Sequence, residues 1–165
     1  MGQFDWKPDV YLERIRAQVP GYDELQDQSV AAIPFAPERV LELGMGTGET
    51  TRRLIEAFPD AWVIGLDSSP DMVFRARQDY DEVQLARMED PLPDGPWDLV
   101  ISVLSVNQLN DDQRRNLCRQ VKSQSRSLVI GDLFENEQEA TDLAEWSGGE
   151  ISWEKDGLAV IRAVY

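Results

Sequence analysis

Three glycines alternate along the chain directly after a short apolar run. The run is Val40–Leu43, and the glycines are Gly44, Gly46 and Gly48. A plain strand-to-helix turn needs one glycine, whereas alternate glycines let the main chain turn sharply and approach a ligand without Cβ atoms in the way. In an open α/β sheet, ligands bind beyond the carboxyl ends of the strands. The sequence therefore predicts a strand that ends in a ligand-binding loop.

Two carboxylates indicate which ligand this loop accepts. Glu42 stands two positions before the first glycine, and the run lacks the Gly-x-Gly-x-x-Gly spacing of a dinucleotide fingerprint. Glu42 would repel a phosphate but suits the ammonium and sulfonium charges of S-adenosylmethionine. Asp67 follows the next apolar run, Ala61–Leu66, where a carboxylate can accept hydrogen bonds from both hydroxyls of a ribose. The alternative for Asp67 is to cap the helix that follows.

Three stretches carry a resemblance to a known family. They are Val40–Gly48, Ile64–Met72 and Pro96–Ser102, and they closely resemble class I S-adenosylmethionine-dependent methyltransferases. The resemblance covers roughly residues 8–165. It implies an α/β fold with a doubly wound, mainly parallel seven-stranded sheet of order 3-2-1-4-5-7-6, in which strand 7 is antiparallel and helices cover both faces.

The resemblance also implies a cofactor site for S-adenosylmethionine, with S-adenosylhomocysteine as product. In the family the glycine loop holds the methionine part, and the residue matching Met72 packs near the adenine. Arg87 stands where the family commonly has an Asp that contacts the adenine edge, so the contact is carried over to the Met88 backbone and to Glu89. The cofactor residues expected are Glu42, Gly44, Gly46, Thr47, Gly48, Asp67, Ser68, Met72, Met88, Glu89 and Ser102.

Catalytic side chains are harder to assign because the chain has no histidine. The family often carries two histidines where this chain reads Val106-Asn107-Gln108, so imidazole catalysis is excluded. Cys118 is the only cysteine, and we expect it to be a buried apolar residue. No metal site is expected. Methyl transfer from a sulfonium requires mainly alignment and exclusion of water, and the base candidates are Asp132, placed after the fifth strand, and Tyr11.

The alternation of apolar runs and amphipathic segments predicts one domain over residues 1–165, of which 1–36 form an N-terminal helical cap. Asp111 and Asp112 are expected to cap a helix that ends near Lys122. The expected helices are 8–33 in two pieces, 47–58, 70–79, 111–122 and 135–146, and the expected strands are 40–43, 61–66, 83–86, 98–104, 127–130, 151–153 and 158–164.

The region 132–149 is short for the family, so little chain is left there to cover the substrate. We expect the lid to come from the N-terminal aromatic residues or from a second subunit, although such aromatics are more often core residues. The N-terminal aromatics in question are Phe4, Trp6, Tyr11 and Tyr22. Trp146 and Trp153 look exposed in the sequence pattern, which is consistent with a homodimer.

The charge of the chain restricts its partners. Lys and Arg total 16 against 31 Asp and Glu, a formal net charge of -15, which disfavours nucleic acids and anionic membranes. One basic cluster, formed by Arg114, Arg115, Arg119 and Lys122, is expected to be the solvated face of a helix. No apolar segment is long enough to span a membrane, and a cytoplasmic location is expected.

The function that these features favour is methyl transfer to a small-molecule acceptor. A second interpretation is a transfer RNA or protein methyltransferase, because Tyr11–Arg16 and Val19–Tyr22 resemble a branch that includes transfer RNA wobble-base enzymes; the net acidity weighs against RNA. A third is a cofactor-binding module or minimised scaffold without transferase activity. A nicotinamide-dependent reductase is the least favoured.

Overall fold

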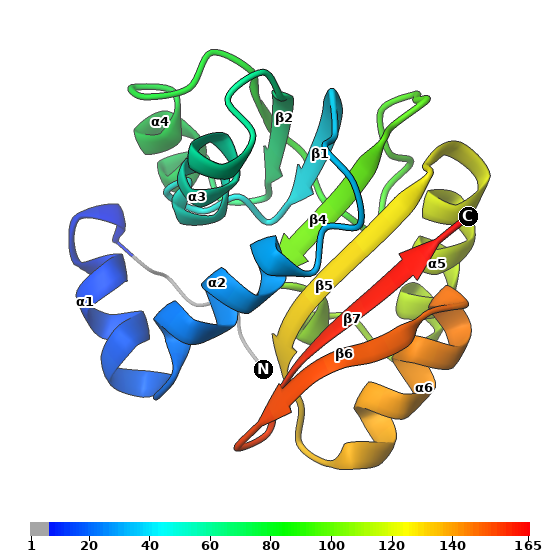
Figure 1. Cartoon of the computed structure of the whole chain (residues 1–165). Helices are drawn as coiled ribbons and strands as arrows, with labels where there is room; N and C mark the ends of the chain where they lie inside the picture. Colours follow the sequence, from blue (N-terminus) through cyan, green and yellow to red (C-terminus); the bar gives the residue numbers. More distant parts are fainter. Residues whose placement is uncertain (1–6) are drawn as a thin grey trace.

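The computed structural model describes residues 7–165, so Phe4 and Trp6 lie outside the described residues. Its strands form one mixed sheet with helices on both faces (Figure 1). The strands are β1 (Arg39–Leu43), β2 (Trp62–Asp67), β3 (Val83–Leu85), β4 (Leu99–Val103), β5 (Ser127–Leu133), β6 (Glu150–Lys155) and β7 (Leu158–Val164). Their order is β3-β2-β1-β4-β5-β7-β6. Strands β1 to β5 pair in parallel and β7 is antiparallel to both β5 and β6, which confirms the predicted topology.

The described helices follow the strands in the alternation that the sequence predicts. They are α1 (Pro8–Gln18), α2 (Tyr22–Ala31), α3 (Glu49–Ala57), α4 (Pro70–Ala76), the 3-10 turn η1 (Val106–Gln108), α5 (Asp111–Gln124) and α6 (Glu137–Ser147). None of the helices in the described part of the chain is long and apolar enough to cross a membrane.

Alternate residues of the central strands supply two separate cores. In β1, Leu41 and Leu43 pack with the side chains of α5 and α6, whereas Val40 packs with those of α1, α2 and α3. Every residue of β4 is buried, as expected for a parallel strand covered on both faces. The small α4 core, which includes Met45 and Val83, lies over the β2–β3 end of the sheet. The two faces together hold the carboxyl ends of β1, β2 and β4 at one edge.

The N-terminal helices contact the sheet and the helices that cover it. Helix α2 lies across the sheet near α3 and β5 (Figure 1), and Leu25 on this helix is wholly buried. The close approach requires Gly131 in β5, because a Cβ atom there would overlap the hydroxyl of Ser29. Within the described residues the N-terminal segment forms two helices, of which α2 packs on one face of the sheet and α1 contacts α2 and α4.

Several boundaries differ from the sequence-based prediction. Asn110 caps α5 through a reciprocal capping box with Gln113, so the prediction that Asp111 and Asp112 are the cap was wrong. A carboxylate in the first turn is favourable without being the cap, and the pattern alone does not separate the two roles. Strand β5 continues past Ile130, because its pairing with β7 extends to Leu133. Helix α4 ends at Ala76, three residues earlier than predicted.

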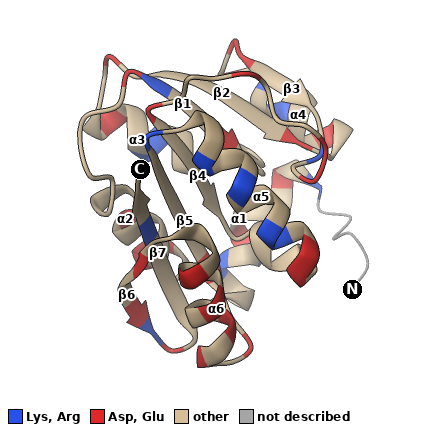
Figure 2. Ribbon diagram, turned by 90° about the vertical axis from the view of Figure 1, so that its right-hand side faces the viewer, with Lys and Arg blue, Asp and Glu red and all other residues tan. Residues whose placement is uncertain are grey.

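Burial corrects two further expectations. Arg114 is only 6% exposed, so the basic cluster on α5 is not wholly a solvated face. Basic positions do gather on α5 (Figure 2), but the Arg115 guanidinium lies over the ring of Trp146, 4.4 Å from its centroid. Trp146 and Trp153 are both half-buried against the cores rather than exposed. The homodimer, which these two residues had suggested, stays a prediction. Cys118 is buried, as expected.

Candidate cofactor and acceptor site

The loop after β1 has the backbone conformation that its glycines predict. Gly44, Gly46 and Gly48 all have positive φ, at 68°, 58° and 94°. Residues with a Cβ atom rarely adopt this left-handed region, which is why the loop needs glycine at each of these positions. The Gly48 amide donates to the Met45 carbonyl at 3.0 Å, and α3 begins at the next residue. Thr47 is half-buried within this turn.

The three glycines face different surroundings. A Cβ atom on Gly44 would collide with Ser105, and one on Gly48 would collide with the ring of Tyr80. A Cβ atom on Gly46 would meet only the ring of Tyr11, at 4.0 Å. Gly44 and Gly48 therefore allow close packing within the protein, and Gly46 is the glycine that leaves space for a ligand.

Asp67 joins the glycine loop to the start of α4. One oxygen of its carboxylate accepts from the Gly46 amide at 2.8 Å and the other accepts from the Ser69 amide at 2.9 Å. Burial raises the pKa of Asp67, and the amides of Ser69, Gly46 and Ser68 oppose that shift. Ser69 itself caps α4 by accepting from the Met72 amide, so Asp67 is not the cap. Ser68 is exposed beside this carboxylate.

Glu42 is enclosed between β1 and α3 and is not exposed at the surface of the loop. It is 1% exposed and accepts a hydrogen bond from the hydroxyl of Thr51 on α3. Burial raises the pKa of Glu42 to about 8, although the hydroxyls of Thr51 and Thr50 lower it in part. The carboxyl group is therefore largely protonated near pH 7, and its first role is to tie β1 to α3.

The remaining residues predicted to bind the cofactor have different surroundings. The methyl group of Met88 would lie 3.5 Å from a Cβ atom on Gly44. Met72 is a buried residue of α4, and Glu89 is bound by the Arg87 guanidinium. Ser102 is wholly buried and donates to the Leu43 carbonyl at 3.0 Å, so its side chain holds β4 to β1.

A narrow hollow of about 10 Å³ lies between the glycine loop and the N-terminal helices. Its lining includes Tyr11 on α1, Tyr22 on α2 and Val103 at the end of β4. Burial raises the pKa of the Tyr11 hydroxyl, and Tyr22 and the carboxylates of Asp67, Glu42 and Glu49 raise it further. Tyr11 is therefore un-ionised at neutral pH and can only donate or accept a hydrogen bond there.

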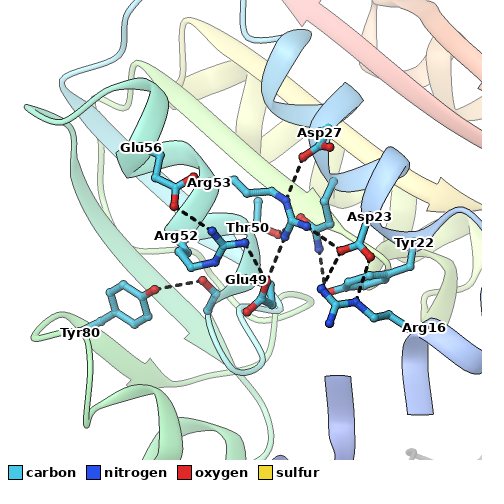
Figure 3. Close-up of polar contacts among 12 residues, drawn as sticks. Arg16, Tyr22, Asp23, Asp27, Glu49, Thr50, Arg52, Arg53, Glu56 and Tyr80 are labelled. Atoms are coloured by element: carbon cyan, nitrogen blue, oxygen red, sulfur yellow. Dashed lines mark hydrogen bonds and ion pairs between the residues drawn. The ribbon is translucent and has the colours of Figure 1, made fainter. Parts of the chain in front are cut away.

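A polar network fixes the helices around this hollow. The Thr50 hydroxyl donates to the side-chain carbonyl of Gln26 at 2.7 Å, and the Gln26 amide donates to the Tyr22 hydroxyl at 3.2 Å. Arg53 on α3 donates to Asp23, Asp27 and Glu49 at 2.7 to 3.0 Å (Figure 3). The ion pairs of this arginine therefore join α2 to α3, the helix that follows the glycine loop.

We expect Arg53→Met to lower the free energy of unfolding by about 1 to 3 kcal/mol, since the guanidinium is 11% exposed and three carboxylates would lose their common partner. Arg52→Met is the matched control, because Arg52 is 45% exposed and should cost no more than about 1 kcal/mol. Urea unfolding measures both. Equal losses in the two variants would show that Arg53 does not fasten the helices.

Asp132, a candidate base, has a different position from the one predicted. It lies within β5 rather than after it and is 0% exposed. Its two carboxylate oxygens accept from the amides of Asn107 and Leu133, each at 2.9 Å. Arg114 donates to the Val106 and Asn107 carbonyls of the same turn, η1, at 3.3 and 3.1 Å. Asp132 and Arg114 together hold η1 from its amide and carbonyl sides.

Stability should depend on pH through the two buried carboxyl groups. Burial raises the pKa of Asp132 to about 7 and that of Glu42 to about 8, against about 4 in an unfolded chain. Below the unfolded pKa each group is protonated in both states and costs the fold nothing. As the pH rises from the unfolded pKa to the folded pKa, the folded state keeps a proton that the unfolded chain has lost, so the free energy of unfolding falls. We expect the free energy of unfolding to fall between about pH 4 and 8, by up to about 1.4 kcal/mol per pH unit for each group.

Asp132→Asn should flatten that dependence below pH 7, and Glu56→Gln, at an exposed carboxylate, should not. The measurement is urea unfolding across the pH range. A slope that is the same in Asp132→Asn and in the wild type would contradict the role given to Asp132.

Sequence reasoning missed two residues of the site. Tyr80 packs on Gly48 and donates to its carbonyl at 3.2 Å, and Ser105 donates to the Gly44 carbonyl at 3.4 Å. Neither belongs to a motif. They are recognised only in the structure, because Ser105 and Tyr80 occupy the places where Cβ atoms on Gly44 and Gly48 would lie. Among residues 7–165, no group of three or more His, Cys, Asp or Glu side chains could hold a metal ion.

Comparison with known proteins identifies the family of this domain. The family model described as "Methyltransferase domain" matches residues 40–126, just over half of the chain, from β1 through α5. The chain belongs to this methyltransferase domain family. Membership agrees with the resemblance to class I S-adenosylmethionine-dependent methyltransferases that the glycine loop and Asp67 carry.

Relatives and solved structures agree with this assignment. The methyltransferase domain is 34% identical over 132 residues to the trans-aconitate 2-methyltransferase of Rhodopseudomonas palustris strain HaA2, covering 76% of the chain and 48% of that relative. It thus spans about half the length of the curated relatives it matches.

Two solved structures share the fold at low sequence identity. One is a TehB-like SAM-dependent methyltransferase from Corynebacterium glutamicum, with a TM-score of 0.68, 19% identity and coverage of 93% of this chain and 96% of that one. The other is human N-acetylserotonin methyltransferase in complex with SAM, with a TM-score of 0.70, 14% identity and coverage of 99% and 60%.

Proposed function

We propose that this domain binds S-adenosylmethionine over the glycine loop and transfers its methyl group to a small-molecule acceptor. The proposal rests on the conformation of Gly46 and on its neighbours. This residue has a positive φ, has only the Tyr11 ring within 4 Å of the place of a Cβ atom, and donates its amide to Asp67. A ligand can therefore lie against the main chain within reach of a carboxylate.

The donors and acceptors around the loop suit this cofactor. Asp67 accepts one amide on each oxygen, and each oxygen has a further lone pair for a ribose hydroxyl. The loop presents backbone to the methionine end, and Met88 adds an apolar side chain close to Gly44. Thr47 and Ser68 are within the same two loops and can add hydroxyls. Glu89 contributes less, because Arg87 already binds it.

When bound, S-adenosylmethionine supplies an activated methyl group: a lone pair of the acceptor forms the new bond to carbon while the electrons of the carbon–sulfur bond stay on sulfur. The chain must align the acceptor and exclude water. Tyr11 and Tyr22 wall the hollow at that point. Tyr11 can orient the acceptor through its hydroxyl, whereas Asp132 is enclosed and acts on η1 rather than on the acceptor.

The other functions considered for the sequence have less support. Phosphate of a dinucleotide at the glycine loop would meet the carboxylate of Asp67, and no Lys or Arg of residues 7–165 lines the hollow beside the loop. Nucleic acid would meet a chain of net charge -15. A cofactor-binding module without transferase activity uses the same site, and only an activity assay separates it from the enzyme.

Methyl-labelled S-adenosylmethionine tests the proposal directly. The domain is incubated with the labelled compound and a panel of small molecules, and labelled products are separated by chromatography. Label should pass to a small molecule with the wild-type domain and not with Gly46→Val. Absence of labelled product from the whole panel, with the cofactor bound, would favour the inactive module.

A further inference from the structure

Tyr80 contacts the last glycine of the glycine loop in two ways. It lies between α4 and β3, and its half-buried ring packs against the small α4 core. The ring also lies against Gly48, where a Cβ atom would overlap it. The Tyr80 hydroxyl donates to the Gly48 carbonyl at 3.2 Å (Figure 3). Tyr80 therefore restricts Gly48 through both the shape of its ring and the hydrogen bond of its hydroxyl.

The Gly48 carbonyl lies where the loop passes into α3. Besides the Tyr80 hydroxyl it accepts from the Arg52 amide at 2.9 Å, the first hydrogen bond of the helix. The same planar peptide group holds the Glu49 amide, which points the opposite way, out of the N-terminal end of α3. No side chain among residues 7–165 caps this end of the helix. The hydroxyl of Tyr80 therefore helps to set the direction of a backbone amide at the loop.

The first half of the loop is held separately, by β2. The Met45 amide donates to the Leu66 carbonyl at 2.9 Å. The Met45 side chain fills the place where a Cβ atom on Gly65 would lie. Loss of the Tyr80 contacts would therefore loosen Gly48 while the first half of the loop stays bound to the sheet.

We infer that Tyr80 is a positioning residue for S-adenosylmethionine, which holds Gly48 in the conformation with which the glycine loop receives the cofactor. The inference rests on the proposed function. Gly48 has a φ of 94°, and an unrestrained glycine adopts negative φ about as readily. A site that is binding-competent for only part of the time binds its ligand more weakly by that fraction. Burial raises the pKa of the Tyr80 hydroxyl, so it keeps its proton at neutral pH and can donate to Gly48.

Tyr80→Phe tests the hydroxyl, because it keeps the ring against Gly48. Its Kd for S-adenosylmethionine should rise about three- to tenfold, the range that corresponds to one hydrogen bond to a backbone carbonyl. Tyr165→Phe is the matched control, since Tyr165 is also half-buried and donates to a backbone carbonyl, that of Ser147, at 2.9 Å. Ser147 is the last residue of α6, outside the site, so this variant should lose similar stability and keep the wild-type Kd. Titration calorimetry measures the Kd, and urea unfolding measures the stability.

Hydrogen exchange of the free proteins separates positioning from a general loss of stability. The Gly48 and Arg52 amides are hydrogen-bonded within the loop and the first turn of α3. They should exchange faster in Tyr80→Phe than in the wild type and in Tyr165→Phe, and S-adenosylmethionine should restore their protection. An unchanged Kd or unchanged exchange in Tyr80→Phe, or equal losses of affinity in the two variants, overturns the inference while wild-type binding upholds the proposed function. Absence of S-adenosylmethionine binding in the wild type overturns the proposed function and this inference with it.

Discussion

Asp67→Ala is expected to weaken S-adenosylmethionine binding by about 2 to 4 kcal/mol, or about 30- to 1000-fold in Kd. Two effects add in this variant. The ribose loses a charged acceptor, and the amides of Gly46 and Ser69 lose their common partner. The variant should stay folded, because the strands on both sides of Asp67 retain their pairing. Titration calorimetry measures the affinity, and urea unfolding checks the fold.

Asp67→Asn is the matched control for the charge. It keeps one acceptor oxygen for the Gly46 amide or the ribose and lacks the negative charge, so its affinity should fall between those of the wild type and Asp67→Ala. Wild-type affinity in the alanine variant would remove Asp67 from the cofactor site.

Gly46→Val is expected to weaken cofactor binding by more than about a hundredfold. A branched side chain at φ 58° strains the backbone by about 1 to 3 kcal/mol, and it also fills the space between the loop and Tyr11. The variant removes no charge and no hydrogen-bonding side chain. A loss of affinity would therefore show that the cofactor needs the space that the valine side chain fills.

Gly148→Val separates the two effects. Gly148 ends α6 with φ 70° and lies outside the site, so valine there costs a similar strain and should leave the affinity for S-adenosylmethionine unchanged. Both variants are compared by calorimetry at a temperature where urea unfolding shows them to be folded. Tight cofactor binding by Gly46→Val would contradict the position assigned to the ligand.

The fold was predictable because its pattern is local. Continuous apolar runs such as that of β4 indicate buried parallel strands, and Ser69 followed by Pro70 predicts the start of α4 correctly. The strand order came from the family resemblance. The cap of α5 was misplaced by one residue because Asn110, Asp111 and Asp112 are all good capping types, and only the geometry selects Asn110.

The site was predictable only where a motif defines it. The alternate glycines and Asp67 meet at one edge, as predicted. The burial of Glu42 and Asp132 was not predictable, because the side of the sheet on which each carboxyl group lies follows from strand register. The contacts of Tyr80 with Gly48 and of Arg53 with Asp23 join residues that are distant in sequence. The pattern of a single sequence does not indicate such contacts.

Calorimetric titration of the domain with S-adenosylmethionine, alongside a reduced nicotinamide dinucleotide, shows which of the two cofactors the glycine loop binds. We propose that S-adenosylmethionine lies over the glycine loop at Gly46 and binds to Asp67. We expect saturable one-to-one binding of S-adenosylmethionine, lost in Gly46→Val, and no saturable heat from the dinucleotide. Saturable binding of the dinucleotide, with none of S-adenosylmethionine, would contradict the proposal.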